Sequence, residues 1–303
     1  MAVGLPAAAA RPITIPIPVL VAAFCLIWSS AFAVSKVALA DCPPLLLASA
    51  RCLLAGAVML GVAAISGAGW RLARRDLAIF AVLGVANNAL YLGLNCVGMR
   101  SVSAGLSALI VSANPVLTAL LAAFVLGERL TWRKAAGLLL GVGGVTVIVE
   151  SRLTGGESPI GVAFVMGALL ALVGGTILFK RLAPGGGLWI GNCVQNLTGG
   201  LALVPFASTF ESIGDIVPSW RLLMAFAFLV FLSAIVAYLL WLHLLTVLGA
   251  TAASAYHFIM PPLGLFFGWL LLGERLDFVD FLGVLPVALG IWLVTHVAAP
   301  MRS

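Results

Sequence analysis

Apolar residues occur along the chain in runs long enough to cross a membrane, and the short segments between the runs hold most of the charged residues. A helix of about 20 residues matches the hydrocarbon core of a bilayer, which is about 30 Å thick. The runs predict ten membrane-spanning helices, at residues 17–40, 44–66, 77–98, 102–125, 131–150, 160–180, 188–208, 221–247, 251–271 and 278–298. The strands of an outer-membrane barrel would instead alternate apolar and polar residues over about 10 positions. The pattern is therefore typical of an all-α membrane protein.

The composition points to the same class. Of the 303 residues, 63% are apolar and 9% are charged, whereas a soluble domain carries about 25% charged residues. The mean hydropathy is +1.21. These values exclude a soluble enzyme, a disordered chain and a nucleic-acid binder. The net charge of +6 comes mostly from basic residues at the ends of the apolar runs, so the expected partners are the lipid bilayer and a small-molecule substrate. The sequence indicates no obligate protein partner.

The cysteines predict no cross-link or metal centre. The five, Cys25, Cys42, Cys52, Cys96 and Cys193, form no C-x-x-C pair, and four of them lie inside apolar runs. Cysteine in such a place behaves as a small apolar residue. We therefore expect neither a disulfide framework nor a metal site.

The charges between the runs predict the orientation. With the N-terminus inside the cell, ten Lys and Arg residues fall in cytoplasmic segments, and five fall in outer loops and span ends. Because Lys and Arg accumulate on the cytoplasmic side of membrane proteins, both termini are predicted to be cytoplasmic. Residues 1–16, rich in Ala and Pro, are predicted to form a loose N-terminal tail.

One block of sequence occurs twice. Residues 126–130, LGERL, recur as residues 272–276, 146 positions later, and the same offset pairs Pro115 with Pro261. A five-residue match that includes a Glu-Arg pair indicates duplication. The predicted units are a first five-helix repeat at residues 17–150 and a second five-helix repeat at residues 160–298.

An odd number of spans in each repeat predicts that the second copy is inverted in the membrane. The charges after the block agree, because Arg133 and Lys134 follow the first copy whereas Asp277 and Asp280 follow the second. Two inverted halves can exchange conformations around a central cavity, so that a shared site faces each side of the membrane in turn. The repeat therefore favours a carrier that works by alternating access.

Polar and aromatic residues inside the runs predict which side chains meet the substrate, since such groups usually face a water-filled cavity. Asn87, Tyr91 and Asn95 are spaced by four residues and share one helical face. The repeat maps Tyr91 and Asn95 onto Ala237 and Trp241, which predicts a polar wall facing an aromatic wall. The candidate substrate-binding residues are Trp28, Asn87, Tyr91, Asn95, Ser107, Asn114, Tyr238, Trp241, Tyr256 and His257. A structural role stays open for each, because intramembrane Asn also bonds neighbouring helices and aromatic residues also pack.

Three further features allow two interpretations each. Pro115 and Pro261 remove a backbone donor within a span and are either gating hinges or passive bends. Arg51, charged and inside the second span, either contacts a substrate carboxylate or reaches the outer headgroups or a helix end. Glu128 and Glu274, at span ends, are expected to make capping or ion-pair contacts.

The energy source stays open. No Asp or Glu lies near the centre of a predicted span, so the usual carboxylate relay for protons is missing. Histidine is the side chain whose ordinary pKa is close to neutral pH, so His243 and His257 are candidates for a proton site, and a hydrogen-bonded structural histidine is the alternative. The sequence fits facilitated movement of the substrate down its gradient, and it also fits transport that is weakly coupled to protons.

The ten spans, the duplicated P-x(10)-LGERL block and the run Arg51-Cys52-Leu53-Leu54-Ala55 resemble the drug/metabolite transporter superfamily in its EamA-type ten-span branch. Within this branch the chain is most similar to YddG-type amino-acid exporters. The resemblance implies a basket of ten helices and a central cavity lined mainly by the third, fourth, eighth and ninth spans, with help from the first and sixth. It also implies export of aromatic or other apolar amino acids across a bacterial inner membrane, without an organic cofactor.

The predicted function is therefore an inner-membrane carrier that exports small metabolites, with aromatic or other apolar amino acids as the expected substrates. An exporter of drugs or other metabolites with the same fold is one alternative, and a passive channel is another. An intramembrane hydrolase is not favoured, because the chain has no G-x-S-x-G elbow and no H-E-x-x-H pair. We expect the protein not to be an enzyme.

Overall fold

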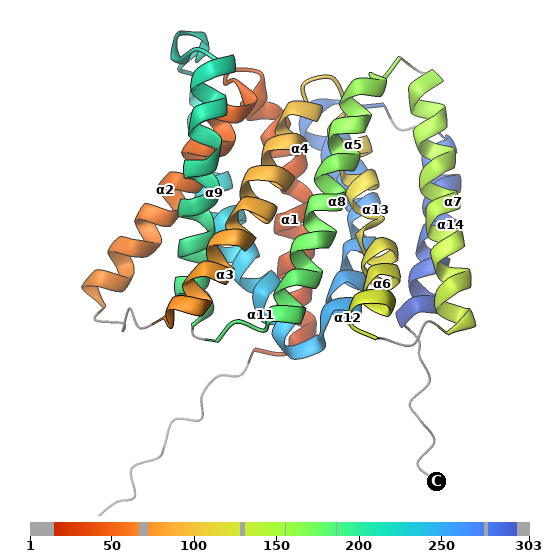
Figure 1. Cartoon of the computed structure of the whole chain (residues 1–303). Coiled ribbons are helices and arrows are strands. Elements are labelled where there is room, and N and C mark those ends of the chain that lie inside the picture. Colours follow the sequence, from red (N-terminus) through yellow and green to blue (C-terminus); the bar gives the residue numbers. More distant parts are fainter. Residues whose placement is uncertain are drawn as a thin grey trace, which may run out of the picture.

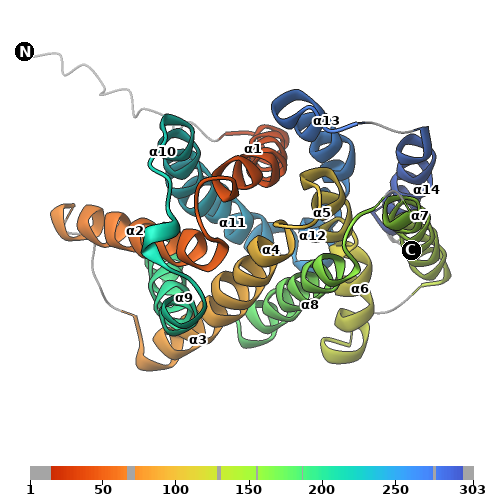
Figure 2. The same cartoon turned by 90° about the horizontal axis from the view of Figure 1, so that it is seen from above.

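The computed structural model describes residues 15–66, 72–127, 131–154, 156–185, 187–275 and 278–295. These residues form a bundle of helices that run broadly between two edges, seen from the side in Figure 1 and from above in Figure 2. Strands do not occur in these ranges. Helix α1 begins and helix α14 ends at the same edge, the lower one in Figure 1. We refer to this edge as the lower edge and to the opposite one as the upper edge.

The helices have the following bounds in chain order: α1 Ile17–Leu39, α2 Pro44–Ile65, α3 Arg74–Gly84, η1 Val85–Leu92, α4 Gly93–Gly98, α5 Ala104–Val111, α6 Asn114–Val125, α7 Trp132–Thr154, α8 Pro159–Leu182, α9 Leu188–Phe210, η2 Ile213–Asp215, α10 Trp220–Ala227, η3 Phe228–Ala237, α11 Tyr238–Leu248, α12 Ala250–Ala255, η4 Tyr256–Ile259, α13 Met260–Leu272 and α14 Phe278–Thr295. Each predicted apolar run corresponds to one helix or to consecutive helices in this series.

Six continuous helical segments are long and apolar enough to cross a membrane: Ile17–Leu39, Pro44–Ile65, Arg74–Gly98, Ala104–Val125, Pro159–Leu182 and Trp220–Leu248. Further helices are shorter or less apolar, such as Met260–Leu272. The chain is therefore an all-helical, multi-pass membrane protein, and the count of ten spans stays a prediction.

Two of the long segments are not regular α-helices. Stretches η1 and η3 are π-helical and stand in the middle of the segments 74–98 and 220–248. In a π-helix each hydrogen bond spans five residues, whereas in an α-helix it spans four, and π-helical turns are frequent at functional sites. The sequence predicted plain α-helices here.

Two other segments are interrupted near a proline. Residues Ser112 and Ala113 separate α5 from α6, and the short 3₁₀ stretch η4 separates α12 from α13. Pro115 and Pro261 stand in the first turn of α6 and of α13, where the missing N–H would have had no partner in any case. The backbone therefore breaks ahead of each proline.

Glycines allow the closest helix contacts. Helix α7 packs along α14, and α2 packs along α9. A methyl group added at Gly290 would lie 2.5 Å from the Gly137 carbonyl oxygen and 3.1 Å from the Gly141 nitrogen. Gly137 and Gly141 therefore let α14 approach the backbone of α7 closely, as small residues do between membrane helices. The five cysteines are all buried, and none forms a disulfide.

The duplicated block makes one clear contact at the upper edge. The Glu274 carboxylate accepts hydrogen bonds from the backbone N–H groups of Ala104 and Gly105, at 2.7 and 3.0 Å. The predicted capping role of Glu274 is confirmed, since these groups begin α5. Glu128, its counterpart, lies outside the described residues.

Candidate functional site

A cavity of about 50 Å³ lies inside the bundle. It is lined by Trp28, Ala31, Phe32 and Ser35 of α1, Arg51 and Cys52 of α2, Asn87, Asn88, Tyr91 and Leu92 of η1, Asn95 of α4, Asn196 of α9, Ser233 and Ala234 of η3, and Tyr238 of α11. Metabolite sites usually enclose about 300–1,000 Å³. In this conformation the cavity has space for a few water molecules, so a metabolite enters only when the helices move apart.

Arg51 is the charged group of the cavity wall. Its side chain is 6% exposed, and one guanidinium nitrogen, Nη2, donates a hydrogen bond to Ser233 Oγ at 3.2 Å. Its Nε has no hydrogen-bond partner. The Arg75–Asp76 salt bridge lies outside the cavity, and the described residues that line the cavity include no Asp or Glu. A buried guanidinium normally has a carboxylate partner, so the cavity presents an uncompensated positive charge.

Amide groups occupy the next part of the wall. The Gln195 Oε1 atom accepts a hydrogen bond from the Tyr238 hydroxyl at 2.7 Å and another from Asn87 Nδ2 at 3.3 Å. Asn196 Nδ2 donates to Asn192 Oδ1 at 2.6 Å, and Asn192 Nδ2 donates to the Ala234 carbonyl at 3.0 Å. These bonds connect α9 with η1 and η3 and fix the polar side of the cavity.

Aromatic rings form another part of the wall. Trp28 stacks between Tyr91 and Tyr238, with ring centroids 6.4 Å apart in both pairs and interplanar angles of 16° and 19°. The three rings come from α1, η1 and α11. Such a wall suits the side chain of a substrate that is aromatic or apolar.

A second aromatic cluster lies on the lower side of Trp28. Phe24, one turn earlier in α1, stacks on Trp241 with centroids 5.7 Å apart, and Trp241 contacts the His257 ring edge-on at 4.6 Å. His257 is fully buried, and neither of its ring nitrogens has a hydrogen-bond partner. The cluster of Phe24, Trp241 and His257 packs against Trp28, which belongs to the cavity wall.

The candidates from the sequence fall into two groups. Trp28, Arg51, Asn87, Tyr91, Asn95 and Tyr238 line the cavity. Ser107, Asn114, Pro115, Trp241, Tyr256, His257 and Pro261 do not line it in this conformation.

Two polar candidates that do not line the cavity, Ser107 and Asn114, form hydrogen bonds with nearby side chains. Ser107 Oγ donates to Asn95 Oδ1 at 2.9 Å and so supports a lining residue from behind. Asn114 Oδ1 accepts from Thr118 Oγ1 at 2.8 Å within α6. The segments that contain these residues pack against one another, α5 on α13 and α6 on α12.

Several polar residues of the site were not selected from the sequence as candidates. Ser35, Asn88, Asn196 and Ser233 line the cavity, and the buried Gln195 bonds two lining side chains. The repeat contained a signal for two of them. Ser233 stands 146 positions after Asn87, and Gln195 stands 144 positions after Arg51.

A polar cavity enclosed by apolar, membrane-length helices is the arrangement of a multi-pass membrane transporter. The sequence model of the EamA-like transporter family matches residues 16–150 and 159–296. The chain belongs to the EamA-like transporter family.

Several relatives match over nearly their whole length. The uncharacterized transporter YvbV of Bacillus subtilis is 31% identical over 91% of this chain and 90% of its own. The S-adenosylmethionine/S-adenosylhomocysteine transporter of Chlamydia muridarum is 30% identical over 89% of this chain and 88% of its own. A probable amino-acid metabolite efflux pump of Escherichia coli is 27% identical over 88% of this chain and 91% of its own. A protein of known crystal structure has the same fold, with a TM-score of 0.68 at 18% identity, over 92% of this chain and 97% of that one.

Proposed function

We propose that this transporter is a carrier that exports aromatic or other apolar amino acids, or close derivatives, across a bacterial inner membrane by alternating access. The observation that carries the proposal is the cavity inside the bundle, whose wall combines a buried cation and amide groups with stacked aromatic rings. An amino acid has matching parts, a charged headgroup and an apolar side chain. The proposed substrate-binding residues are those that line the cavity, together with the candidates Ser107, Asn114, Trp241, Tyr256 and His257 in a more open conformation.

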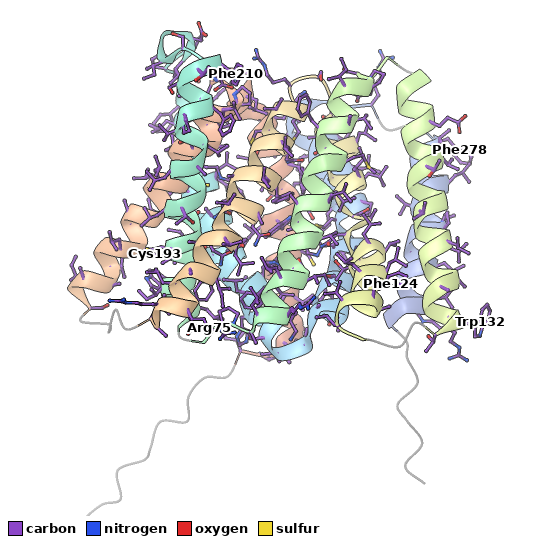
Figure 3. The ribbon with its side chains drawn as sticks, in the orientation of Figure 1. Arg75, Phe124, Trp132, Cys193, Phe210 and Phe278 are labelled. Atoms are coloured by element: carbon purple, nitrogen blue, oxygen red, sulfur yellow. The ribbon has the colours of Figure 1, made fainter. Side chains whose placement is uncertain are left out.

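The arrangement of backbone irregularities supports two equivalent halves. Stretches η1 and η3 occupy positions that correspond under the repeat, and so do the break after α5 and the stretch η4. Trp132 and Phe278, which also correspond, lie toward the lower and the upper edge respectively (Figure 3). These features are the ones expected of halves that are inverted about an axis in the membrane plane.

Corresponding lysine contacts support two gates. Lys36 Nζ donates to the carbonyl oxygens of Met99 and Val102, the second at 2.8 Å, near the upper edge. Lys180 Nζ donates to the Leu245 carbonyl at 3.3 Å near the lower edge. Lys36 corresponds to Lys180 and Met99 to Leu245. In the proposed cycle each lysine closes one edge while the other edge opens, and Pro115 and Pro261 stand where the helices bend.

The relatives support this substrate class. The names of the Escherichia coli pump and the Chlamydia transporter both refer to compounds related to amino acids. S-adenosylmethionine combines an amino-acid headgroup with an aromatic ring, which would suit a wall of Trp28, Tyr91 and Tyr238. This agreement favours amino-acid compounds over drugs that lack such a headgroup.

Counterflow in liposomes tests the proposal. The purified protein is reconstituted with an excess of unlabelled phenylalanine inside, and uptake of labelled phenylalanine, methionine and threonine is measured. We expect transient, saturable accumulation, strongest for phenylalanine. Competition by unrelated drugs but by no amino acid would instead favour a drug exporter of the same fold. Currents of single open channels would favour a passive channel, and the absence of any uptake of the three amino acids would refute the amino-acid assignment.

A further inference from the structure

Two hydrogen bonds of the site correspond to each other under the repeat. Arg51 of α2 bonds Ser233 of η3 at 3.2 Å, and Gln195 of α9 is bonded by Asn87 of η1 at 3.3 Å. Gln195 stands 144 positions after Arg51, and Ser233 stands 146 positions after Asn87. Each bond therefore joins the same two positions of the duplicated unit, and each connects one half of the chain to the other.

The two bonds differ in charge. Arg51 is buried, its only hydrogen-bond partner among the described residues is a neutral hydroxyl, and its Nε faces no acceptor. A cation removed from water is strongly destabilised unless an anion pairs with it. Because the described wall of the cavity contains no Asp or Glu, a transported molecule with a negative group can supply the missing anion. A carboxylate matches the planar fork of guanidinium donors.

The corresponding position in the other half carries no charge. Gln195 is fully buried, its Oε1 already accepts hydrogen bonds from Tyr238 and Asn87, and its Nε2 has no partner. A neutral amide can donate a hydrogen bond there, but it cannot compensate a second buried carboxylate. The cavity is thus built for one negative charge at the Arg51 position.

We propose that the substrates of this carrier are recognised through a single carboxylate, which binds the Arg51 guanidinium. In this scheme the amino group of an amino acid is not required for binding, and Gln195 excludes molecules with two carboxylates. The inference rests on the proposed function and narrows its substrate class.

Four compounds that each contain one phenyl ring separate the contributions of the carboxylate and the amino group to binding. They are phenylalanine, 3-phenylpropanoate, 2-phenylethylamine and benzylmalonate. Binding to the purified protein is measured as a rise in its unfolding temperature, and transport is measured as competition in the counterflow assay. We expect phenylalanine and 3-phenylpropanoate to bind and to compete, and we expect the amine and the dicarboxylate to do neither. Equal binding of 2-phenylethylamine, or binding of none of the four, would overturn the inference.

The variant Arg51→Gln should raise the half-saturating concentration of both monocarboxylates about 10- to 100-fold, the loss expected for hydrogen bonds to a charged group. Without ligand its unfolding temperature should stay equal or increase, because an unpaired buried charge is removed. A merely structural arginine would give the opposite result, a less stable protein with unchanged affinity. Arg51→Lys, which keeps the charge but not the fork, should fall between wild type and Arg51→Gln.

The reciprocal variant is Gln195→Arg, which should gain measurable binding of benzylmalonate. Thr176→Val is the matched control, since the buried Thr176 hydroxyl donates only to the Leu172 carbonyl of its own helix and does not line the cavity. We expect it to behave as wild type. If carboxylates bind through Arg51 but are not transported, the proposed carrier function is refuted and the inference about Arg51 still holds. If Arg51→Gln transports phenylalanine as well as wild type does, the inference about Arg51 is refuted and the carrier function still holds.

Discussion

A substitution of Glu274, in the duplicated block, tests how much one helix-capping carboxylate contributes to the stability of the fold. Its two oxygens accept hydrogen bonds from the Ala104 and Gly105 N–H groups, which have no partner within α5. Ser103 Oγ accepts from the next N–H of the same turn, so this helix start is fully bonded. Gly268 leaves room for the arrangement, because a methyl group there would lie 2.5 Å from Glu274 Oε2. The contact joins the loop after α13 to the start of α5.

The variant Glu274→Gln should be destabilising although it preserves the shape of the side chain. Two N–H donors require two acceptors, and an amide offers one acceptor and one donor. One bond is lost, the other is no longer charge-assisted, and the favourable interaction of a negative charge with the helix start is removed. For a half-buried group we estimate a cost of about 2 kcal/mol. For a chain of 303 residues this corresponds to a fall in unfolding temperature of about 3 °C.

Thermal unfolding of the purified protein in detergent measures the effect. Asp215→Asn is the matched control, since Asp215 is an exposed carboxylate in η2, and we expect it to leave the unfolding temperature unchanged. The repeat predicts that Glu128→Gln is destabilising by a similar amount. Equal unfolding temperatures for Glu274→Gln, Asp215→Asn and wild type would show that the contact contributes nothing, and the capping argument would be refuted.

Three further predictions concern the cavity and its upper edge. A methyl group at Gly175 would lie 2.0 Å from Asn87 Oδ1, so Gly175→Ala should displace this amide and lower the counterflow rate about tenfold, the equivalent of one lost hydrogen bond. Asn95→Ala should weaken substrate binding about 3- to 10-fold, seen as a higher half-saturating concentration with normal folding. Lys36→Met removes two hydrogen bonds near the upper edge and should speed labelling of a Ser35→Cys variant by an impermeant thiol reagent added outside. An unchanged labelling rate would show that Lys36 does not restrict access to the cavity from the upper edge.

The position of the helices was predictable from apolar runs, whereas their internal irregularities were not. A run that is apolar at nearly every position contains no periodic marker, so the change from α-helical to π-helical hydrogen bonding in η1 and η3 leaves no trace in the pattern. Pro115 and Pro261 did mark the interrupted segments, because proline disfavours a helical conformation just ahead of it. The length of each interruption depends on packing and could not be inferred.

The site was predictable where polar residues stand out against an apolar run. Spacing by four placed Asn87, Tyr91 and Asn95 on one helical face, and all three line the cavity. Ser107 has the same sequence signature, yet its hydroxyl bonds Asn95 from outside the cavity. Whether a polar group faces the cavity or another helix is decided by its neighbours in space, which spacing along one helix does not contain. Ser233, a single small polar residue in an apolar run, was missed for the same reason.

The proposed mechanism makes two demands on a duplicated chain, and they act on different parts of it. Two end states of similar free energy are reached most simply when the halves share their backbone irregularities, as η1 and η3 do. A substrate with unlike ends needs a cavity without symmetry. Duplication can meet both demands only if the helices keep their shape while the side chains diverge, as they have at the charged Arg51 and the neutral Gln195. Recognition should therefore depend on positions at which the halves differ, and gating on positions at which they agree.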